Sequence, residues 1–220
     1  MPGKVIFIIL AVTMSPMTSP VSGSGEQFEG MLHYELIIND ESQDFRYAIK
    51  RGLVRLEIDD PHMGGSMTIL ISPEDGRMAM LIHEIRAYTE IDINDVATRQ
   101  ESFINQMEQI TETGNRMTIA GVETLEYLIH TDNNGTLRIW SPEESTQYGH
   151  FQFPDFGNRI LAHMLNHDLP VALFPFAIEY ESDQTHIEIH LQKIEEGNLA
   201  IDLFTVPANY RNISVTIPDY

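Results

Sequence analysis

The stretch from Phe174 to Tyr210 constrains the fold most, because its apolar and polar residues alternate with a period of two. Such alternation predicts strands with one buried and one solvated face. We expect two strands joined by a polar turn at Asp183 and Gln184, then a third strand and an exit that ends in proline. Folding the first two strands about this turn brings their apolar residues together on one face. The predicted pairs are Tyr180 with Ile187, Ile178 with Ile189 and Phe176 with Leu191.

The same period recurs through most of the chain. Polar clusters with Gly, Pro, Asn or Asp separate the alternating runs, which predicts sequential antiparallel hairpins. The runs that we interpret as strands are Phe28–Asn39, Phe45–Lys50, Leu53–Ile58, Met67–Ser72, Met78–Ile82, Ala87–Ile93, Asn115–Ile119, Val122–Thr131 and Thr136–Ser141.

Two segments carry a helical period instead. In the first, apolar residues follow a helical spacing after Asn94, and Gly114 can end the helix. They are Val96, Phe103, Ile104, Met107 and Ile110. We predict one amphipathic helix over Asp95–Thr111 and a shorter helix that begins after Asp155 and ends at Leu169 and Pro170. The predicted fold is therefore mainly β (α+β), a curved antiparallel half-barrel of about eleven strands with one long and one short inserted helix.

Composition limits the partners. The 220 residues include 33 acidic and 13 basic side chains, so the formal net charge is −20. This charge repels phosphate groups and therefore argues against nucleic acid or an anionic membrane as partner. The chain has no cysteine. This excludes a disulfide framework, a thiol nucleophile and a cysteine metal site.

Residues 1–25 have the layout of a secretory signal peptide. Lys4 precedes an apolar run from Val5 to Val12, and small residues follow. The run is shorter than the roughly 20 residues that span a bilayer, although an uncleaved anchor is the alternative. We expect residues 1–25 to be a signal peptide, residues 26–220 to form a single domain without a transmembrane segment, and the mature protein to be periplasmic or secreted.

Several motifs occur together in a characteristic order after residue 27. They are FEGMLHYEL, FRYAIKRGLVRLEI, GGSMTILISPEDGRMAMLI, AYTEI, MTIAGVETLEYLI, GTLRIW, FAIEYES and DLFTVPANY. Together they resemble an uncharacterised family of exported bacterial domains, domain of unknown function "forty-four twelve". That family looks like a relative of the LolA/LolB-like lipoprotein carriers and sensors. The resemblance implies a half-open barrel around an apolar cavity, in an exported protein that binds a lipid, a lipoprotein or another apolar ligand.

The predicted ligand site is the inner face of this half-barrel, gated by the Asp95–Thr111 helix. Methionine side chains are flexible and line adaptable sites, although ordinary core packing would use the same residues. The residues that we expect to line the cavity are Leu36, Ile38, Met67, Ile69, Met80, Ile82, Phe103 and Met107. The alternative is an envelope protein-interaction or structural module with a packed interior and no ligand.

Polar residues give weaker indications. His163 and His167 are four residues apart in the short predicted helix, but a zinc site needs at least a third protein ligand. Glu179, Glu188 and His190 share a predicted strand face and could hold a cation, although an exposed polar face is the simpler interpretation. No nucleophile–base constellation is visible, so we expect a non-enzymatic protein with no cofactor and no metal. The sequence predicts no oligomeric state.

Overall fold

The computed structural model describes residues 27–60, 65–92, 107–131, 136–148, 173–181 and 186–213. Among these residues, twelve strands form one sheet, with two short 3-10 helices outside it. The N-terminal strands are β1 (Gly30–Ile38), β2 (Glu41–Lys50), β3 (Leu53–Asp60), β4 (Gly65–Ser72), β5 (Arg77–Ile82) and β6 (Ala87–Asp92). The remaining elements are β7 (Met107–Ile119), β8 (Val122–Thr131), β9 (Thr136–Pro142), η2 (Ser145–Tyr148), β10 (Ala177–Glu181), β11 (His186–Glu196), η4 (Ile201–Phe204) and β12 (Arg211–Asn212).

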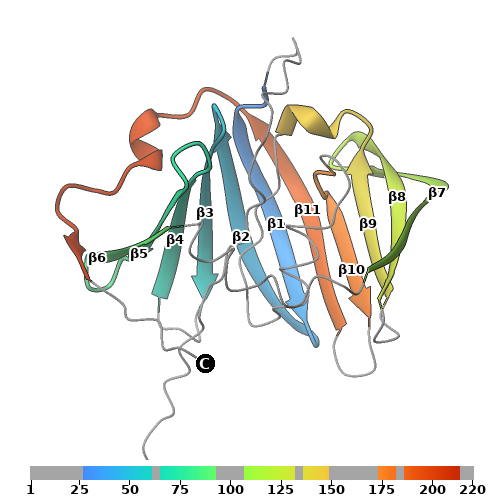
Figure 1. Cartoon of the computed structure of the whole chain (residues 1–220), viewed down its shortest axis with the longest axis horizontal. Coiled ribbons are helices and arrows are strands. Elements are labelled where there is room, and N and C mark those ends of the chain that lie inside the picture. The colour runs from blue at the N-terminus through green and yellow to red at the C-terminus, as the bar shows by residue number, and fades with distance from the viewer. Residues whose placement is uncertain are drawn as a thin grey trace, which may run out of the picture.

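The strand order is β12-β6-β5-β4-β3-β2-β1-β11-β10-β9-β8-β7 (Figure 1). Neighbouring strands are antiparallel, except for the parallel pair of β12 and β6. The prediction of a mainly β, curved antiparallel sheet is confirmed. The predicted succession of hairpins is wrong at one point. β6 and β7 follow each other in the sequence but lie near opposite ends of the strand order, and β1 pairs with β11.

The hairpin predicted around Asp183 has the expected register. Tyr180 pairs with Ile187, and Ile178 pairs with Ile189. The Leu191 amide donates a hydrogen bond of 2.7 Å to the Phe176 carbonyl, which continues the same alignment. The register of β10 and β11 was predictable because the alternation assigns each residue to a face and the short polar segment between the two strands limits how they can align.

Tight turns join several strands as the sequence predicted. Asn39 and Asp40 connect β1 to β2 with φ values of 48° and 71°, and Arg51 and Gly52 connect β2 to β3 with 51° and 77°. Two consecutive residues with positive φ form the turn whose twist matches that of an antiparallel pair. Asn, Asp and Gly tolerate this conformation best, so the local chemistry fixes the turn positions.

The long predicted helix is wrong where the structure describes it. Met107, Ile110 and Thr111 lie in β7, the edge strand beside β8. The register with β8 shifts twice, between Met107 and Ile110 and between Glu112 and Arg116. Such irregularities interrupt the period of two, and the first of them explains the helical spacing of Met107 and Ile110. Residues 95–106 and the short predicted helix between Asp155 and Pro170 lie outside the described residues.

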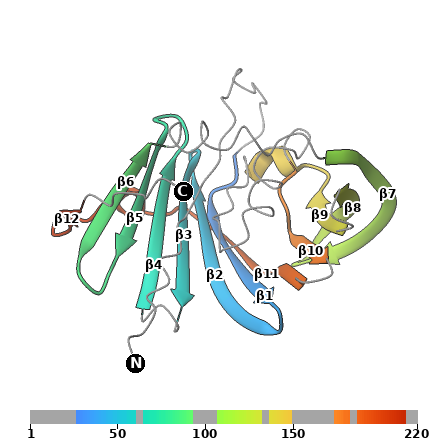
Figure 2. The ribbon, with the colours of Figure 1, turned by 60° about the horizontal axis from the view of Figure 1, so that its bottom comes forward.

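The sheet has one apolar and one largely polar face. Cross-strand partners place the apolar residues of β1 to β5 and β8 to β11 on one side, which we call the inner face. Figure 2 shows β7 to β10 curling round, with η2 in gold inside the curl. The core residues on the inner face include Leu32, Tyr34, Tyr47, Leu56, Ile69, Ile129, Leu137, Ile139, Ile178 and Ile189.

The outer face carries a segment of its own. After β11, the chain from Gly197 to Ile213, which we call the C-terminal strap, runs across to β6 at the far edge (Figure 1, red). It includes η4 and ends in β12. Apolar side chains are also buried on this outer side of β2, β4 and β5 and on the strap itself, namely Ala48, Leu70, Leu81 and Phe204.

We predict that Ile189→Ala destabilises the protein by about 2–5 kcal/mol, because truncation of a fully buried side chain leaves a cavity. Ile189 is fully buried between its register partners Leu36 and Ile178. Urea unfolding followed by far-UV circular dichroism measures this free energy.

Ile85→Ala is the control for this prediction. Ile85 is 50% exposed. Its truncation should change stability by less than about 0.5 kcal/mol, as is usual for surface positions. Equal effects of the two substitutions would contradict the assigned core.

Candidate functional site: the inner face and the outer polar strip

The predicted ligand-site residues on β1, β4 and β5 all occupy the inner face. Met67 pairs with Ile82 and Ile69 pairs with Met80, so these four side chains form two adjacent rows across β4 and β5. Leu36 lies on β1 opposite Ile189, and Ile38 lies two residues further on. The structure therefore brings together the β4 and β5 residues and places the β1 pair three strands away in the same face.

The other two predicted residues do not join this group. Met107 lies in β7, at the opposite end of the strand order from β4 and β5. Phe103 lies outside the described residues. Phe103 and Met107 were assigned to the cavity because both fell on the predicted Asp95–Thr111 helix, and Met107 lies in a strand.

Aromatic side chains fill the inner face beside β1 and β11. Tyr148 of η2 lies against three phenylalanines, with ring centroids 4.9 Å from Phe28, 5.2 Å from Phe174 and 5.3 Å from Phe176. Phe174 also meets Tyr47 edge-on at 5.9 Å. These distances are typical of attractive aromatic pairs. This part of the interior is packed core, and we call it the aromatic cluster.

One buried hydroxyl within this region is satisfied by the backbone. Tyr34 donates a hydrogen bond of 2.9 Å to the carbonyl of Pro175. Burial, with the neighbouring Tyr47 and Tyr148, raises the pKa of Tyr34 well above its ordinary value. The phenol is therefore neutral at physiological pH and serves as a structural donor.

The end of the inner face at β4 and β5 is less covered. Ile69 is fully buried, whereas Met67, Met80 and Ile82 are half-buried. Every second residue of β3, β4 and β5 faces inward, and within the ranges Val54–Ile58, Met67–Ile71 and Met78–Ile82 all of these inward side chains are aliphatic or methionine. This end therefore offers an uncharged, partly accessible apolar surface built around flexible thioethers.

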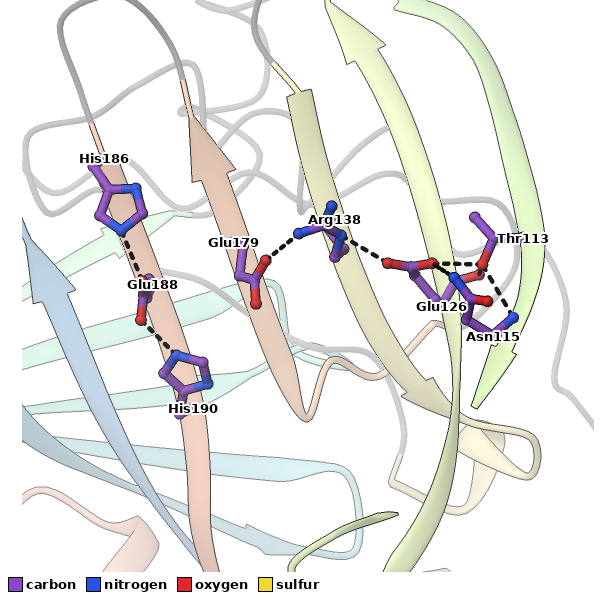
Figure 3. Close-up of polar contacts among 8 residues, drawn as sticks. All are labelled: Thr113, Asn115, Glu126, Arg138, Glu179, His186, Glu188 and His190. Atoms are coloured by element: carbon purple, nitrogen blue, oxygen red, sulfur yellow. Dashed lines mark hydrogen bonds and ion pairs between the residues drawn. The ribbon is translucent and has the colours of Figure 1, made fainter. Parts of the chain in front are cut away.

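A polar strip crosses the outer face from β11 to β7 (Figure 3). Glu188 lies between two histidines of its own strand, and its two oxygens are each 2.7 Å from an imidazole Nε2, one of His186 and one of His190. The hydrogen bonds to His190 and His186 outweigh the effect of burial and lower the pKa of Glu188. The carboxylate thus stays ionised with both oxygens already engaged.

The cation site suggested by Glu179, Glu188 and His190 does not form. Glu179 pairs with Glu188 in register, as predicted, but its carboxylate forms an ion pair with Arg138 of β9. Among the described residues, no group of three His, Asp or Glu side chains is arranged to hold a metal ion. Sequence reasoning missed Arg138 because the neighbour of β10 could not be assigned before β9 was placed beside it. His163 and His167 lie outside the described residues.

Arg138 continues the strip to a buried carboxylate on β8. Its Nε lies 2.7 Å from Oε1 of Glu126, whose side chain is only 6% exposed. Thr113 and Asn115 of β7 each donate a hydrogen bond of 2.6 Å to Oε2 of the same carboxylate. Burial raises the pKa of Glu126, but these two hydrogen bonds and the charge of Arg138 outweigh it, so the pKa is lowered overall. The strip therefore ties β7, β8, β9 and β10 together.

The fold and the inner face define an open, curved β-sheet protein with an apolar interior. The chain belongs to the family described as "Domain of unknown function (DUF4412)", whose model matches residues 28–210. The resemblance inferred from the ordered motifs is thereby confirmed. A comparison with curated proteins finds no match.

Solved structures resemble the chain at low sequence identity. An uncharacterized conserved protein from Thermus thermophilus is 8% identical, with a TM-score of 0.51 over 84% of this chain and 90% of that one. MucB from the Pseudomonas aeruginosa MucA/MucB complex is 10% identical, with a TM-score of 0.49 over 86% of this chain and 59% of that one. LprF from Mycobacterium bovis is 12% identical, with a TM-score of 0.35 over 83% of this chain and 90% of that one.

The part of the chain that the structure describes contains no helix with the length and apolarity to cross a bilayer.

We predict that Glu126→Gln lowers the unfolding free energy at neutral pH by about 1–3 kcal/mol, because its partners lose a charged acceptor. These partners are Arg138, Thr113 and Asn115. A carboxyl whose pKa is depressed by folding stabilises the protein above its unfolded pKa, and this contribution is lost as pH falls through the folded pKa. The wild type should therefore lose more stability than the variant as pH falls below the ordinary pKa of glutamate. Urea unfolding at several pH values measures both effects.

Glu123→Gln is the matched control on the same strand. The Glu123 side chain is 63% exposed in its ion pair with Arg116. Such an exposed pair contributes little to stability. If the unfolding free energy of Glu126→Gln varied with pH in the same way as that of the wild type, Glu126 and its three partners would not control stability in acid.

Proposed function

We propose that this protein is an exported, non-enzymatic binding protein that carries or senses a lipid, a lipoprotein or another apolar ligand in the cell envelope. The proposed domain is residues 26–220, which follow a signal peptide of residues 1–25. The observation that supports this function is the uncharged inner face, which is half-buried at Met67, Met80 and Ile82 beside a fully packed interior. The resemblance to LolA/LolB-like carriers points in the same direction.

The proposed binding region is narrower than the one predicted from sequence. The aromatic cluster already occupies the interior beside β1 and β11, so a ligand chain would lie against β3, β4 and β5. Ile69 is fully buried and would support this surface from beneath, whereas Met67, Met80 and Ile82 would contact the ligand. Leu36 and Ile38 of β1 were also predicted to line the site, but they lie three strands from β4 and fall outside this narrower region.

Burial of hydrocarbon would supply the binding energy. Each methylene transferred from water to this surface contributes about 0.8 kcal/mol, so a chain of several methylenes suffices for useful affinity. The inner positions of β3 to β5 carry no charge to pair with a headgroup. The proposal therefore requires that a polar headgroup remains at the rim or in solvent.

The second candidate is an envelope protein-interaction or structural module whose interior binds nothing. The aromatic cluster favours this function, because Phe174 and Phe176 are fully buried and pack against Tyr148 of the chain itself. Native mass spectrometry of protein isolated directly from the envelope fraction separates the two candidates. A co-purifying lipid mass supports the carrier, and a mass equal to the bare polypeptide supports the interaction module.

We predict that Met80→Asp reduces binding of the uncharged fluorescent probe N-phenylnaphthylamine by about tenfold or more, because the carboxylate must be desolvated beneath the bound probe. Ala79→Asp is the matched control: it introduces the same charge one residue away, on the opposite face of β5. It should leave probe affinity unchanged. Fluorescence titration measures affinity, and far-UV circular dichroism verifies that both variants fold.

Equal probe affinity for wild type and Met80→Asp would reject the β4–β5 surface as the binding region. Equal losses in both aspartate variants would point to destabilisation, and the inner face would then have no demonstrated role in binding.

A further inference from the structure

The C-terminal strap is anchored firmly at its first residues. Lys50, which is buried, forms an ion pair of 2.5 Å with Glu29 and donates a hydrogen bond of 2.9 Å to Oδ1 of Asn198. The same Glu29 carboxylate accepts a hydrogen bond of 2.8 Å from the Leu199 amide. Breaking this anchor would leave a buried ammonium group without its counter-charge, which is costly.

The middle of the strap rests on β3. The Arg55 guanidinium donates a hydrogen bond of 2.8 Å to the carbonyl of Leu203 in η4. Phe204 is buried, whereas Ile201 and Leu203 are exposed by 49% and 36%. One aromatic side chain and one hydrogen bond therefore hold this part against the outer face.

The described contacts of the strap's tip, residues 210–213, are small. The Tyr210 hydroxyl lies 2.5 Å from Nδ1 of His83, and the two rings meet edge-on. The Arg211 amide of β12 donates to the Arg86 carbonyl at 3.0 Å, and the amide of Ile213, which follows β12, donates to the Tyr88 carbonyl at 2.8 Å. Arg211 and Asn212 are exposed. Water can therefore replace the β12 bonds at lower cost than it could replace the buried ion pair at the base of the strap.

The tip contacts the same end of β4 and β5 as the proposed ligand surface. His83 follows Ile82 directly, and its Nε2 lies 2.7 Å from Oγ1 of Thr68, the residue after Met67. Met67 and Ile82 are cross-strand partners on the inner face, while His83 contacts Tyr210 of the tip and Thr68 contacts His83. The contact at Tyr210 is therefore separated from the inner surface only by Thr68 and His83, which directly follow Met67 and Ile82.

We propose that the C-terminal strap is a latch whose tip, residues 210–213, opens while its base stays anchored, and whose opening loosens the β5–β6 edge beside Met67 and Ile82. Opening separates β12 from β6 and leaves β6 as a free edge strand. The latch itself depends only on the outer-face contacts. Its effect on ligand exchange rests on the proposed function.

Hydrogen exchange of the full-length chain tests the latch without any ligand. Tyr210→Phe removes only the hydroxyl bonded to His83, and Ile213→Pro removes the amide bonded to Tyr88. Each should raise amide exchange in β5 and β6 by about fivefold, the effect of losing one net hydrogen bond on an opening equilibrium. Exchange at Gly197 and Leu199 should not change, because the base stays closed.

Asn212→Pro is the matched control. In a parallel pair, alternate amides point to the neighbouring strand. The Asn212 amide therefore points away from β6, while the amides of Arg211 and Ile213 bond to it. This substitution should leave β6 exchange at the wild-type rate. Unchanged exchange in both Tyr210→Phe and Ile213→Pro would overturn the latch, as would an equal increase at the base.

A reversible lock tests the coupling to the inner face. Asn212 and Tyr88 are register partners, and the chain has no other cysteine. Asn212→Cys with Tyr88→Cys therefore provides a single disulfide. If the latch controls access, oxidation should slow the release of N-phenylnaphthylamine by about threefold or more, and reduction should restore it. Equal release rates would overturn the coupling. A probe that fails to bind even the reduced protein would reject the proposed function and leave the exchange result to decide the latch.

Discussion

The pairing of β1 with β11 holds the structure together. It joins the first described strand to the last long strand of the sheet, and it continues from Gly30 opposite Glu196 to Ile38 opposite Ile187. Without it, β1 to β6 and β7 to β11 would be two separate sets of hairpins. With it, the apolar faces of both sets become one inner face. Burial of that face supplies most of the stabilisation.

The two ends of this sheet are finished in different ways. At β6, the C-terminal strap adds β12 as a further strand and covers part of the outer face. At β7, two register shifts interrupt the edge, and the exposed side chains of Glu112 and Arg116 carry charge. Bulges and charges on an edge strand disfavour pairing with another chain, so both ends are protected by the chain itself.

The outer and inner faces are stabilised by different kinds of interaction. On the outer face, Arg138 between Glu179 and Glu126 links three strands through charge, and those groups are already satisfied by one another. On the inner face, Tyr148, Phe174 and Phe176 complete the core beside β1 and β11. The half-buried methionines of β4 and β5 remain as the apolar surface that is only partly used by folding.

The sequence by itself determined the local structure. The alternation in β10 and β11, together with the short polar segment between them, predicted their register, and residues such as Asn39, Asp40 and Gly52 placed the turns. Both signals act between neighbours in the chain, which is why they could be recognised in advance. The inner-face positions of Met67, Met80 and Ile82 followed from the same period. The irregular β7 misled this reasoning, since its bulges disturb the alternation from which strands are recognised.

Only the tertiary structure decided which distant segments meet. The partners of Glu179 and Glu126, the anchor between Lys50 and Asn198 and the contact between His83 and Tyr210 each join residues whose strands become neighbours after folding. Alternation of apolar and polar residues indicates which face of the sheet a side chain occupies, but it does not indicate which strand lies beside it. Strand order depends on the summed burial and pairing of the whole sheet, and no local stretch of sequence contains that sum.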